Sequence, residues 1–443
     1  MARRARRRLP LEPVDVEISD LSHDGRGVGR VEDKVTFVHA ALPGERVSAR
    51  LTGRNRRFDE AVTLAVETSS NQRVEPECPW FGYCGGCALQ HLDHAAQLEW
   101  KMQRLRENFR RIGQVEPTEW MTPISADPWN YRRRARLSVR NVPGKGRVLV
   151  GFREIGGRYV ADIEACRVLH PAFADRLMSL SELIGRLSIP DRIAQVECAA
   201  GDDTAAVVIR HLDPLTSADE KALIEWSERA GIAVWLQSGG PASVERLWPD
   251  GHRLTYSLEA FGLEFAFHPQ QFIQVNAAVN RELTRKAVEL MGGGPEDRIL
   301  DLFCGLGNFS LPLARNAGEV LGVELDEGLV TSAQNNAATN GIENARFIAA
   351  DLMQPVEELA WMQQRFDGVL IDPPRSGAAE ILPLVAATDA SRVVYVSCDP
   401  ATLARDAGTL VNEYGFDMTR AGIADMFPHT AHVESLALFV RRQ

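Results

Sequence analysis

The sequence predicts three successive regions: a small β-barrel, a mixed α+β region and a C-terminal α/β region built on a parallel sheet. Three observations support this prediction. A chain of 443 residues is long enough for about three domains. Short apolar runs separated by turn signals fill residues 12–66, whereas strands and helices alternate after about residue 268. The composition, 45% hydrophobic and 25% charged, is that of an ordinary globular protein.

The barrel is expected over residues 8–67, where four or five strands are separated by glycine-containing turns. Its arginines predict a face that binds a polyanion such as RNA. They are Arg26, Arg30, Arg54, Arg56 and Arg57.

The charge is unevenly distributed along the chain. The net charge is −10, yet residues 1–57 carry +5 and residues 101–158 carry +9, which leaves −24 for the rest. Two basic regions on an acidic body favour a directed polyanion site over two merely solvated faces. The sequence has no apolar run long enough to span a membrane, and its arginine-rich start has neither the apolar core of a secretory signal nor a low acidic content downstream. We therefore expect a cytoplasmic protein with no membrane partner.

The central α+β region is expected over residues 68–262. A helix over 93–112 has a basic second half and is expected to pack on the C-terminal region. Strands are expected at 131–139, 146–154, 193–200 and 204–212, and helices at 171–187 and 217–231.

The chain has seven cysteines, an odd number that suits a reducing compartment. Three of them, Cys78, Cys84 and Cys87, are clustered, and Cys166 follows downstream. Four soft ligands at this spacing suit an iron–sulfur cluster or zinc. A radical enzyme would leave one iron open and need only three cysteines, so a fourth ligand indicates a structural or RNA-positioning role. Glycines 82, 85 and 86 would let backbone amides approach the sulfurs.

The α/β region, residues 263–443, begins with a strand that leads into a glycine loop at Gly305 and Gly307. Glu324 ends the next strand and can bind ribose hydroxyls, and Asp351 ends the third. Ser310 stands where a dinucleotide-binding motif would have its third glycine. An adenosine without phosphates, as in S-adenosylmethionine, therefore fits better than a dinucleotide. The alternative is a structural turn beside solvated acids.

Two further strands end at Asp372 and at Cys398. A cysteine just past a strand end is placed as a nucleophile would be, although a small buried hydrophobe is the plain alternative. Beside a methyl donor, a thiolate that adds to carbon 6 of a pyrimidine turns carbon 5 into a nucleophile, and a base must later remove the carbon-5 proton. Glu434, at the start of the last strand, is the candidate base.

Several motifs occur in the order found in one family. They are CPWFGYCGGCALQHL, FIQVN, LDLFCGLGNFS, DPPRSG, SCDP and HVESLALF. Together they make the chain similar to the RNA uracil-5-methyltransferases, over nearly its whole length. The four-cysteine arrangement resembles the iron–sulfur members that methylate 23S ribosomal RNA.

This resemblance implies a TRAM domain, an OB-like RNA-binding barrel, at the N-terminus and a Rossmann-like class I methyltransferase domain at the C-terminus. It implies Cys398 as nucleophile, Glu434 as general base and S-adenosyl-L-methionine as cofactor. It also implies two sets of binding residues: Gln274, Phe303, Asn308, Glu324, Asp351 and Asp372 for the cofactor, and Cys78, Cys84, Cys87 and Cys166 for a [4Fe–4S] cluster. The expected partner is 23S ribosomal RNA, with no obligate protein partner and a monomeric state.

Alternative functions remain at this stage. The same reaction could act on another 23S uridine or on a transfer RNA, and a cytosine-5-methyltransferase would also use a thiol. A non-catalytic RNA-binding assembly factor could keep a degenerate methyltransferase fold, but the presence of both Cys398 and Glu434 argues against it.

Overall fold

The structure is a computed structural model that describes residues 12–353 and 364–442. The described chain divides into two compact units that are interleaved in sequence. The first unit contains the chain up to Trp100, together with Phe152–Ile163 and Pro428–His432. The second contains Lys101–Gly151, Glu164–Phe427 and the chain from Val433 onwards. Of the described helices, none has the length and apolarity needed to cross a membrane.

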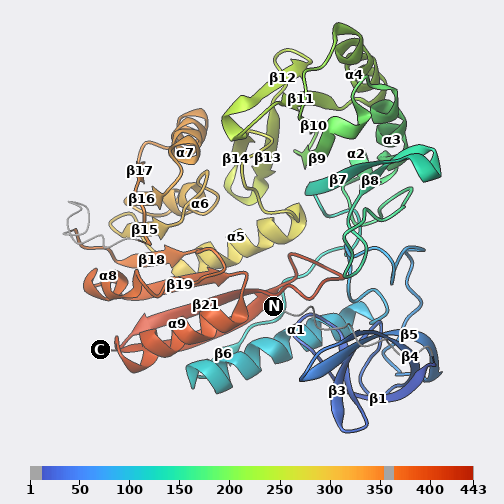
Figure 1. The fold of residues 1–443 in the computed structure, drawn as a ribbon. Coiled ribbons are helices and arrows are strands. Elements are labelled where there is room, and N and C mark those ends of the chain that lie inside the picture. The colour runs from blue at the N-terminus through green and yellow to red at the C-terminus, as the bar shows by residue number, and fades with distance from the viewer. Residues whose placement is uncertain (1–11, 354–363, 443) are drawn as a thin grey trace, which may run out of the picture. The chain divides into compact units, whose positions relative to one another are not determined.

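The first unit begins with a closed five-stranded barrel in the order β1-β2-β3-β5-β4 (Figure 1). Its strands are β1 Val14–Leu21, β2 Gly27–Val31, β3 Lys34–His39, β4 Arg46–Arg54 and β5 Phe58–Thr68. Alternate residues of β1 and β4, among them Val16, Ile18, Val47 and Ala49, form its core. The predicted barrel is confirmed, and closure pairs every strand on both sides.

Two later segments join the first unit through backbone hydrogen bonds to the cysteine-containing loop. The Gly85 N–H donates to the Arg153 carbonyl (2.8 Å). The N–H groups of Ala88 and Leu89 both donate to the His429 carbonyl, at 2.8 and 3.0 Å. These bonds explain why residues far apart in sequence fold with the loop.

The second unit contains a six-stranded sheet in the order β12-β11-β10-β9-β7-β8 and a separate hairpin, β13-β14. The strands of this sheet are β7 Arg134–Val142, β8 Arg147–Gly151, β9 Ile193–Ala200, β10 Ala205–His211, β11 Ala233–Gln237 and β12 Val244–Trp248, and the hairpin strands are β13 Leu254–Leu258 and β14 Leu263–Phe267. The helices are α2 Pro171–Ala174, α3 Leu177–Arg186 and α4 Ser217–Ala230. The single helix expected over 171–187 is two helices, because the Ala174 carbonyl accepts from Cys166 N–H (2.8 Å) instead of continuing the helical ladder.

An eight-stranded sheet in the order β17-β16-β15-β18-β19-β21-β20-β6 dominates the second unit. Its strands are β6 Glu119–Trp120, β15 Arg298–Leu302, β16 Glu319–Glu324, β17 Ala345–Ala349, β18 Gly368–Ile371, β19 Arg392–Ser397, β20 Phe416–Ala424 and β21 Glu434–Arg441. The five strands from β17 to β19 are parallel, as predicted. β21 runs antiparallel between β19 and β20, and neither β20 nor β6 was predicted from the sequence.

Helices cover both faces of this sheet, and Figure 1 shows α5 and α9 on opposite sides of it. The helices are α5 Ala277–Met291, α6 Ser310–Ala314, α7 Glu327–Thr339, α8 Leu382–Ala387 and α9 Pro400–Asn412. The helix expected over 93–112 is α1, His94–Asn108, which continues as the π-helical turn η1, Phe109–Gly113. Gly113 and Gly408 lie so close together that a side chain on either would overlap backbone of the other helix, which explains the tight packing of η1 on α9.

A buried ion pair ties α1 to the end of β20. The Lys101 Nζ lies 2.6 Å from Asp425 Oδ1 and also donates to the Phe427 carbonyl at 3.0 Å. Both charged side chains are almost fully shielded, with 1% and 0% of their surface exposed. Such a pair is costly to break on one side, because the remaining charge stays buried.

We expect Lys101→Met to lower the free energy of unfolding by about 3–5 kcal/mol, because it leaves the Asp425 carboxylate buried without its ammonium partner. Urea denaturation followed by tryptophan fluorescence would measure the change. The double variant Lys101→Met/Asp425→Leu should recover most of the loss, and equal stability of both variants would show that the pair itself is not the cause.

Candidate active site

The strand order of the large sheet defines where a ligand can bind. It reverses between β15 and β18, since the chain proceeds from β15 to β16 and β17 on one side and to β18 and β19 on the other. In open α/β sheets, ligands bind at the carboxyl ends of the strands beside such a reversal. The loop after β15 and the residue after β18, Asp372, lie at this point, as the sequence predicted.

The loop after β15 has a constrained backbone. Phe303 has a φ of 64°, a left-handed conformation that is uncommon for a residue with a side chain and is often found at ligand sites. The Gly305 N–H donates to Glu324 Oε2 (3.1 Å), and Glu324 Oε1 accepts from the N–H groups of Leu325 and Asp326 at 2.9 and 3.1 Å. Glu324 is therefore held in place beside the glycine loop, where the sequence predicted it.

The side chain of Asn308 has structural partners of its own. Its Oδ1 accepts from the Tyr256 hydroxyl (2.9 Å) and from Asn280 Nδ2 (2.9 Å), and its Nδ2 donates to Asn280 Oδ1 (3.0 Å). These bonds attach the loop to β13 and α5. Gln274 lines a small cavity together with Tyr256 and Asn280, so two predicted cofactor residues share neighbours.

Two more carboxylates belong to this region. Asp351 follows β17 and accepts from the Met353 N–H (3.0 Å), and its predicted role stays untested. Asp301, on β15, was not singled out by sequence reasoning. Burial raises its pKa to about 8, although a hydrogen bond with Ser310 acts in the opposite direction, and the charges of Asp372 and Glu324 add to the rise. Only its place within the LDLF run could have drawn attention to it.

Cys398 and Glu434 are brought together by the pairing of β19 with β21. Ser397 pairs with Ser435 in this antiparallel register, and one further step places Cys398 across from Glu434. The turn is held by Asp399, whose carboxylate caps α9 by accepting from Ala401 N–H at 2.9 Å. The two residues that the sequence predicted as nucleophile and base thus lie next to the last pair of this register, near enough for the charge of Glu434 to raise the pKa of Cys398.

The electrostatic surroundings disfavour charge on both groups. Burial raises the pKa of Cys398 to about 11, with further contributions from Glu434 and Asp372, whereas Arg375 lowers it. Burial also raises the pKa of Glu434 to about 7, and the pKa of Asp372 well above its ordinary value. A site with several carboxylates and little solvent suits a cationic ligand. Arg375 belongs to the DPPRSG motif, and sequence reasoning assigned it no role.

The clustered cysteines form no disulfide in the described residues and lie in a loop of turns within the first unit. The Gly86 N–H donates to the Cys84 sulfur, which is the kind of support that an iron–sulfur cluster receives. Cys166 is buried in the second unit. Within the described residues, no three His, Cys, Asp or Glu side chains are arranged closely enough to hold a metal ion. Four cysteine sulfurs are the ligands that an iron–sulfur cluster takes. In the described residues these sulfurs are not grouped as cluster ligands would be.

The basic residues of the two positively charged regions, 1–57 and 101–158, differ in exposure. Residues 1–8 lie outside the described residues. In the stretch 132–140, Arg133 pairs with Asp202 (2.5 Å) and Arg134 donates to the Gln270 and Gln271 carbonyls, so both are used internally. Arg136 and Arg140 are exposed. In the barrel, Arg56 and Arg57 are exposed, whereas Arg26 pairs with Asp24 and Glu60.

Comparisons with known proteins identify the family. The family model "tRNA (Uracil-5-)-methyltransferase" matches residues 254–442, and the TRAM domain model matches residues 8–62. The 23S rRNA (uracil(1939)-C(5))-methyltransferase RlmD of Alkalilimnicola ehrlichii is 51% identical over 439 residues, which is 99% of each chain. RlmD of Xanthomonas campestris pv. campestris is 50% identical over 442 residues, 99% of this chain and 100% of the relative.

A solved structure agrees with this match. The Pyrococcus abyssi tRNA (uracil-54, C5)-methyltransferase, in complex with S-adenosyl-L-homocysteine, aligns with a TM-score of 0.75 and 25% identity. The alignment covers 96% of this chain and 99% of that one. Full-length identity of about one half to the RlmD enzymes is decisive, and the chain belongs to the RNA uracil-5-methyltransferase family, in the group of the RlmD enzymes.

Proposed function

We propose that this protein methylates carbon 5 of one uridine in 23S ribosomal RNA, with S-adenosyl-L-methionine as methyl donor, and that the uridine is the one named for its RlmD relatives, 1939. The observation that supports this most is the proximity of Cys398 and Glu434 where the β19–β21 register ends, at the carboxyl end of β19. A non-catalytic assembly factor would have no need of such a pair.

The chain's own residues supply the covalent part of the reaction. The Cys398 sulfur bonds to carbon 6 of the uracil, and the ring electrons shift so that carbon 5 becomes nucleophilic. Carbon 5 then takes the methyl group from the donor, whose sulfonium sulfur would keep the electron pair of the broken bond and leave as a neutral thioether. Glu434 then removes the proton from carbon 5, the carbon–sulfur bond breaks, and the thiolate leaves with its electron pair. Each proton and electron pair thus has a defined destination.

Cys398 must be a thiolate to attack the uracil, and Glu434 must be ionised to remove a proton. S-adenosyl-L-methionine supplies a sulfonium, a positive charge that favours the ionised forms of nearby acids. We assign its binding to Phe303, Glu324, Asp351 and Asp372, with Gln274 and Asn308 supporting the loop. Burial and neighbouring carboxylates raise the pKa of Cys398 to about 11 even with Arg375 acting in the opposite direction, and the positive charge of a bound sulfonium would lower it.

We further propose that Cys78, Cys84, Cys87 and Cys166 bind a [4Fe–4S] cluster with a structural role. None of the four forms a disulfide in the described residues, and the glycines around Cys84 allow backbone N–H groups to approach sulfur. No step of the methylation passes through this cluster. The exposed arginines of the barrel and of β7 would hold the flanking RNA backbone.

Trapping on a 5-fluorouridine substrate tests the nucleophile. Because fluorine at carbon 5 cannot be removed as a proton, wild-type protein with methyl donor should form a covalent RNA adduct that survives a denaturing gel. Cys398→Ala should form none, and Cys198→Ala, which changes a buried cysteine on β9, should behave as wild type. Adduct formation by Cys398→Ala, or none by folded wild-type protein, would refute the mechanism.

Substitution of the base gives a pH signature. A carboxyl whose pKa is about 7 when folded and about 4.5 when unfolded stabilises the fold below pH 4.5 and loses that contribution as the pH rises through 7. Glu434→Gln does not titrate, so its stability relative to wild type should increase by about 2–3 kcal/mol between pH 5 and pH 8. Urea denaturation of the cofactor-free proteins measures this, and an equal difference at both pH values would contradict the raised pKa.

Methylation by the Glu434→Gln variant should fall by at least about 100-fold.

Removal of one cluster ligand tests the metal assignment. Cys84→Ala should give colourless, iron-free protein of lower stability, whereas Cys304→Ala, a cysteine of the cofactor loop, should keep the cluster's visible absorption. Elemental analysis of the wild type should find iron and sulfide. If the analysis finds zinc and no iron, the four cysteines bind zinc and the cluster proposal is wrong. If the Cys84→Ala protein is still brown, the proposed set of cluster ligands is wrong.

A further inference from the structure

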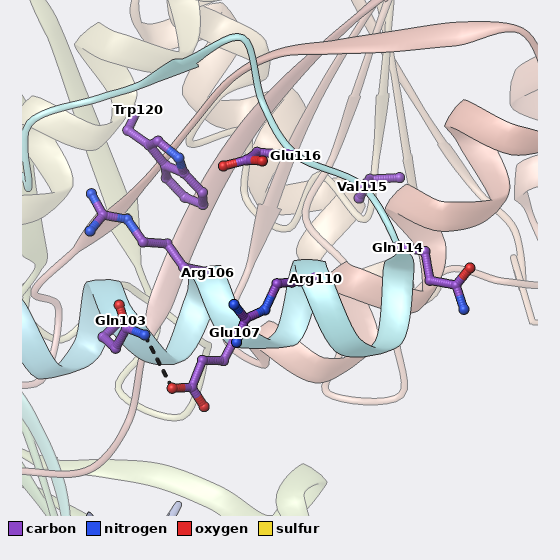
Figure 2. Close-up of a pocket in the computed structure, with 8 residues that line it drawn as sticks. All are labelled: Gln103, Arg106, Glu107, Arg110, Gln114, Val115, Glu116 and Trp120. Carbon is purple, nitrogen blue, oxygen red and sulfur yellow. Dashed lines mark hydrogen bonds between the residues drawn. The ribbon is translucent and has the colours of Figure 1, made fainter.

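A hollow outside the proposed catalytic crevice lies within the second unit, between α1, its π-turn η1 and the segment that leads into β6. Its volume is about 520 Å³, which is within the range of small-ligand sites. Figure 2 shows the residues that line it: Gln103, Arg106, Glu107, Arg110, Gln114, Val115, Glu116 and Trp120. The proposed methylation uses none of them.

The hollow brings a guanidinium together with an aromatic ring. The Arg106 guanidinium carbon lies 5.1 Å from the centroid of the Trp120 ring, and Figure 2 shows this side chain extending from the helix toward the indole. The Phe109 ring, buried in the unit, lies 6.0 Å from Trp120 by centroid and helps to hold it. Arginine and tryptophan are the side chains on which unpaired bases stack most readily.

The charges in the hollow favour an anionic ligand. Within the described part of the chain, neither Arg106 nor Arg110 has an acidic partner, and both are exposed. The negative charge of Glu107 is offset by Arg111, which lies 3.6 Å away. Gln103 also donates a hydrogen bond to Glu107 at 3.1 Å. Glu116 remains as an acceptor for an exocyclic amino group, which cytosine, adenine and guanine have and uracil lacks.

Strand β20 connects the hollow with the region of Glu434 in the same sheet. Trp120 pairs with Ala421 of β20, and Ala424 of β20 pairs with Glu434. The three-residue step from Ala421 to Ala424 is about 10 Å along the strand and reverses the side-chain face, so RNA that reaches both places has to pass around the edge of the sheet. The residues that line the hollow also fall within residues 101–158, the more basic of the two basic regions, with a net charge of +9.

We propose that this hollow is a second RNA subsite that holds one unpaired nucleotide of the strand flanking the target uridine. The base stacks on the Arg106–Trp120 pair, Arg110 contacts the phosphate, and Glu116 selects a base with an amino group. The inference rests on the proposed function, because it takes its ligand to be the same RNA. The small volume and its unpaired arginines favour a nucleotide over a protein segment.

The test measures binding of a 23S rRNA transcript that contains the methylated uridine, at several salt concentrations. Arg106→Gln/Arg110→Gln should weaken binding about tenfold or more and reduce the slope of log affinity against log salt by about one, because a phosphate contact is lost. Trp120→Leu should weaken binding about tenfold with the slope unchanged, because stacking is lost, and Trp120→Phe should restore most of it.

Arg176→Gln/Arg229→Gln is the matched control, since it removes two exposed arginines of the same unit. It should bind RNA and S-adenosyl-L-methionine as wild type, and the Arg106→Gln/Arg110→Gln variant should also keep its methyl-donor affinity. In a second experiment, ultraviolet cross-linking should join RNA to the peptide that contains Trp120.

Equal RNA affinity of the Arg106→Gln/Arg110→Gln variant and the control would overturn the proposal. So would a variant that binds RNA normally but no longer associates with ribosomal particles, since the hollow would then take a protein. Failure of the wild type itself to bind or methylate the transcript would instead refute the proposed function, so the two failures are distinguishable.

Discussion

The register between β19 and β21 is the constraint on which the catalytic arrangement depends. Because side chains alternate between the two faces of a strand, a slip of one residue would turn Glu434 to the other face of the sheet. The pairing of Ser397 with Ser435 prevents this and sets where Cys398 and Glu434 lie relative to each other. β20 flanks β21 on its other side, so the strand that begins with Glu434 is held on both edges.

The same region keeps several acids in a poorly solvated space. Asp301, Asp372 and Glu434 all have raised pKa values, chiefly through burial, and the charges of their neighbours add to this for the two aspartates. Without a cation, such a cluster reduces stability; with one, the same carboxyls become a binding site. The cost in the free protein and the preference for a positively charged donor therefore have one physical origin.

Sequence reasoning reached the elements whose signals are local. The barrel strands and the parallel strands were predictable from short apolar runs between turns, and strand ends predicted where Glu324, Asp372 and Cys398 would lie. β20 was missed because Thr419, Arg420 and Gly422 interrupt its apolar pattern. The partners of Asn308 could not be predicted, since Tyr256 is 52 residues away and its hydrogen bond exists only once β13 and the loop have folded. The break after Ala174 likewise depends on a tertiary bond to Cys166.

The short excursion of Pro428–His432 into the first unit has a structural consequence. Its flanking strands both belong to the second unit, and Glu434 follows it by two residues. The cysteine loop holds this excursion through the His429 carbonyl. Neither unit can therefore be excised as a continuous piece of chain, and only five residues of chain separate the anchored His429 from Glu434.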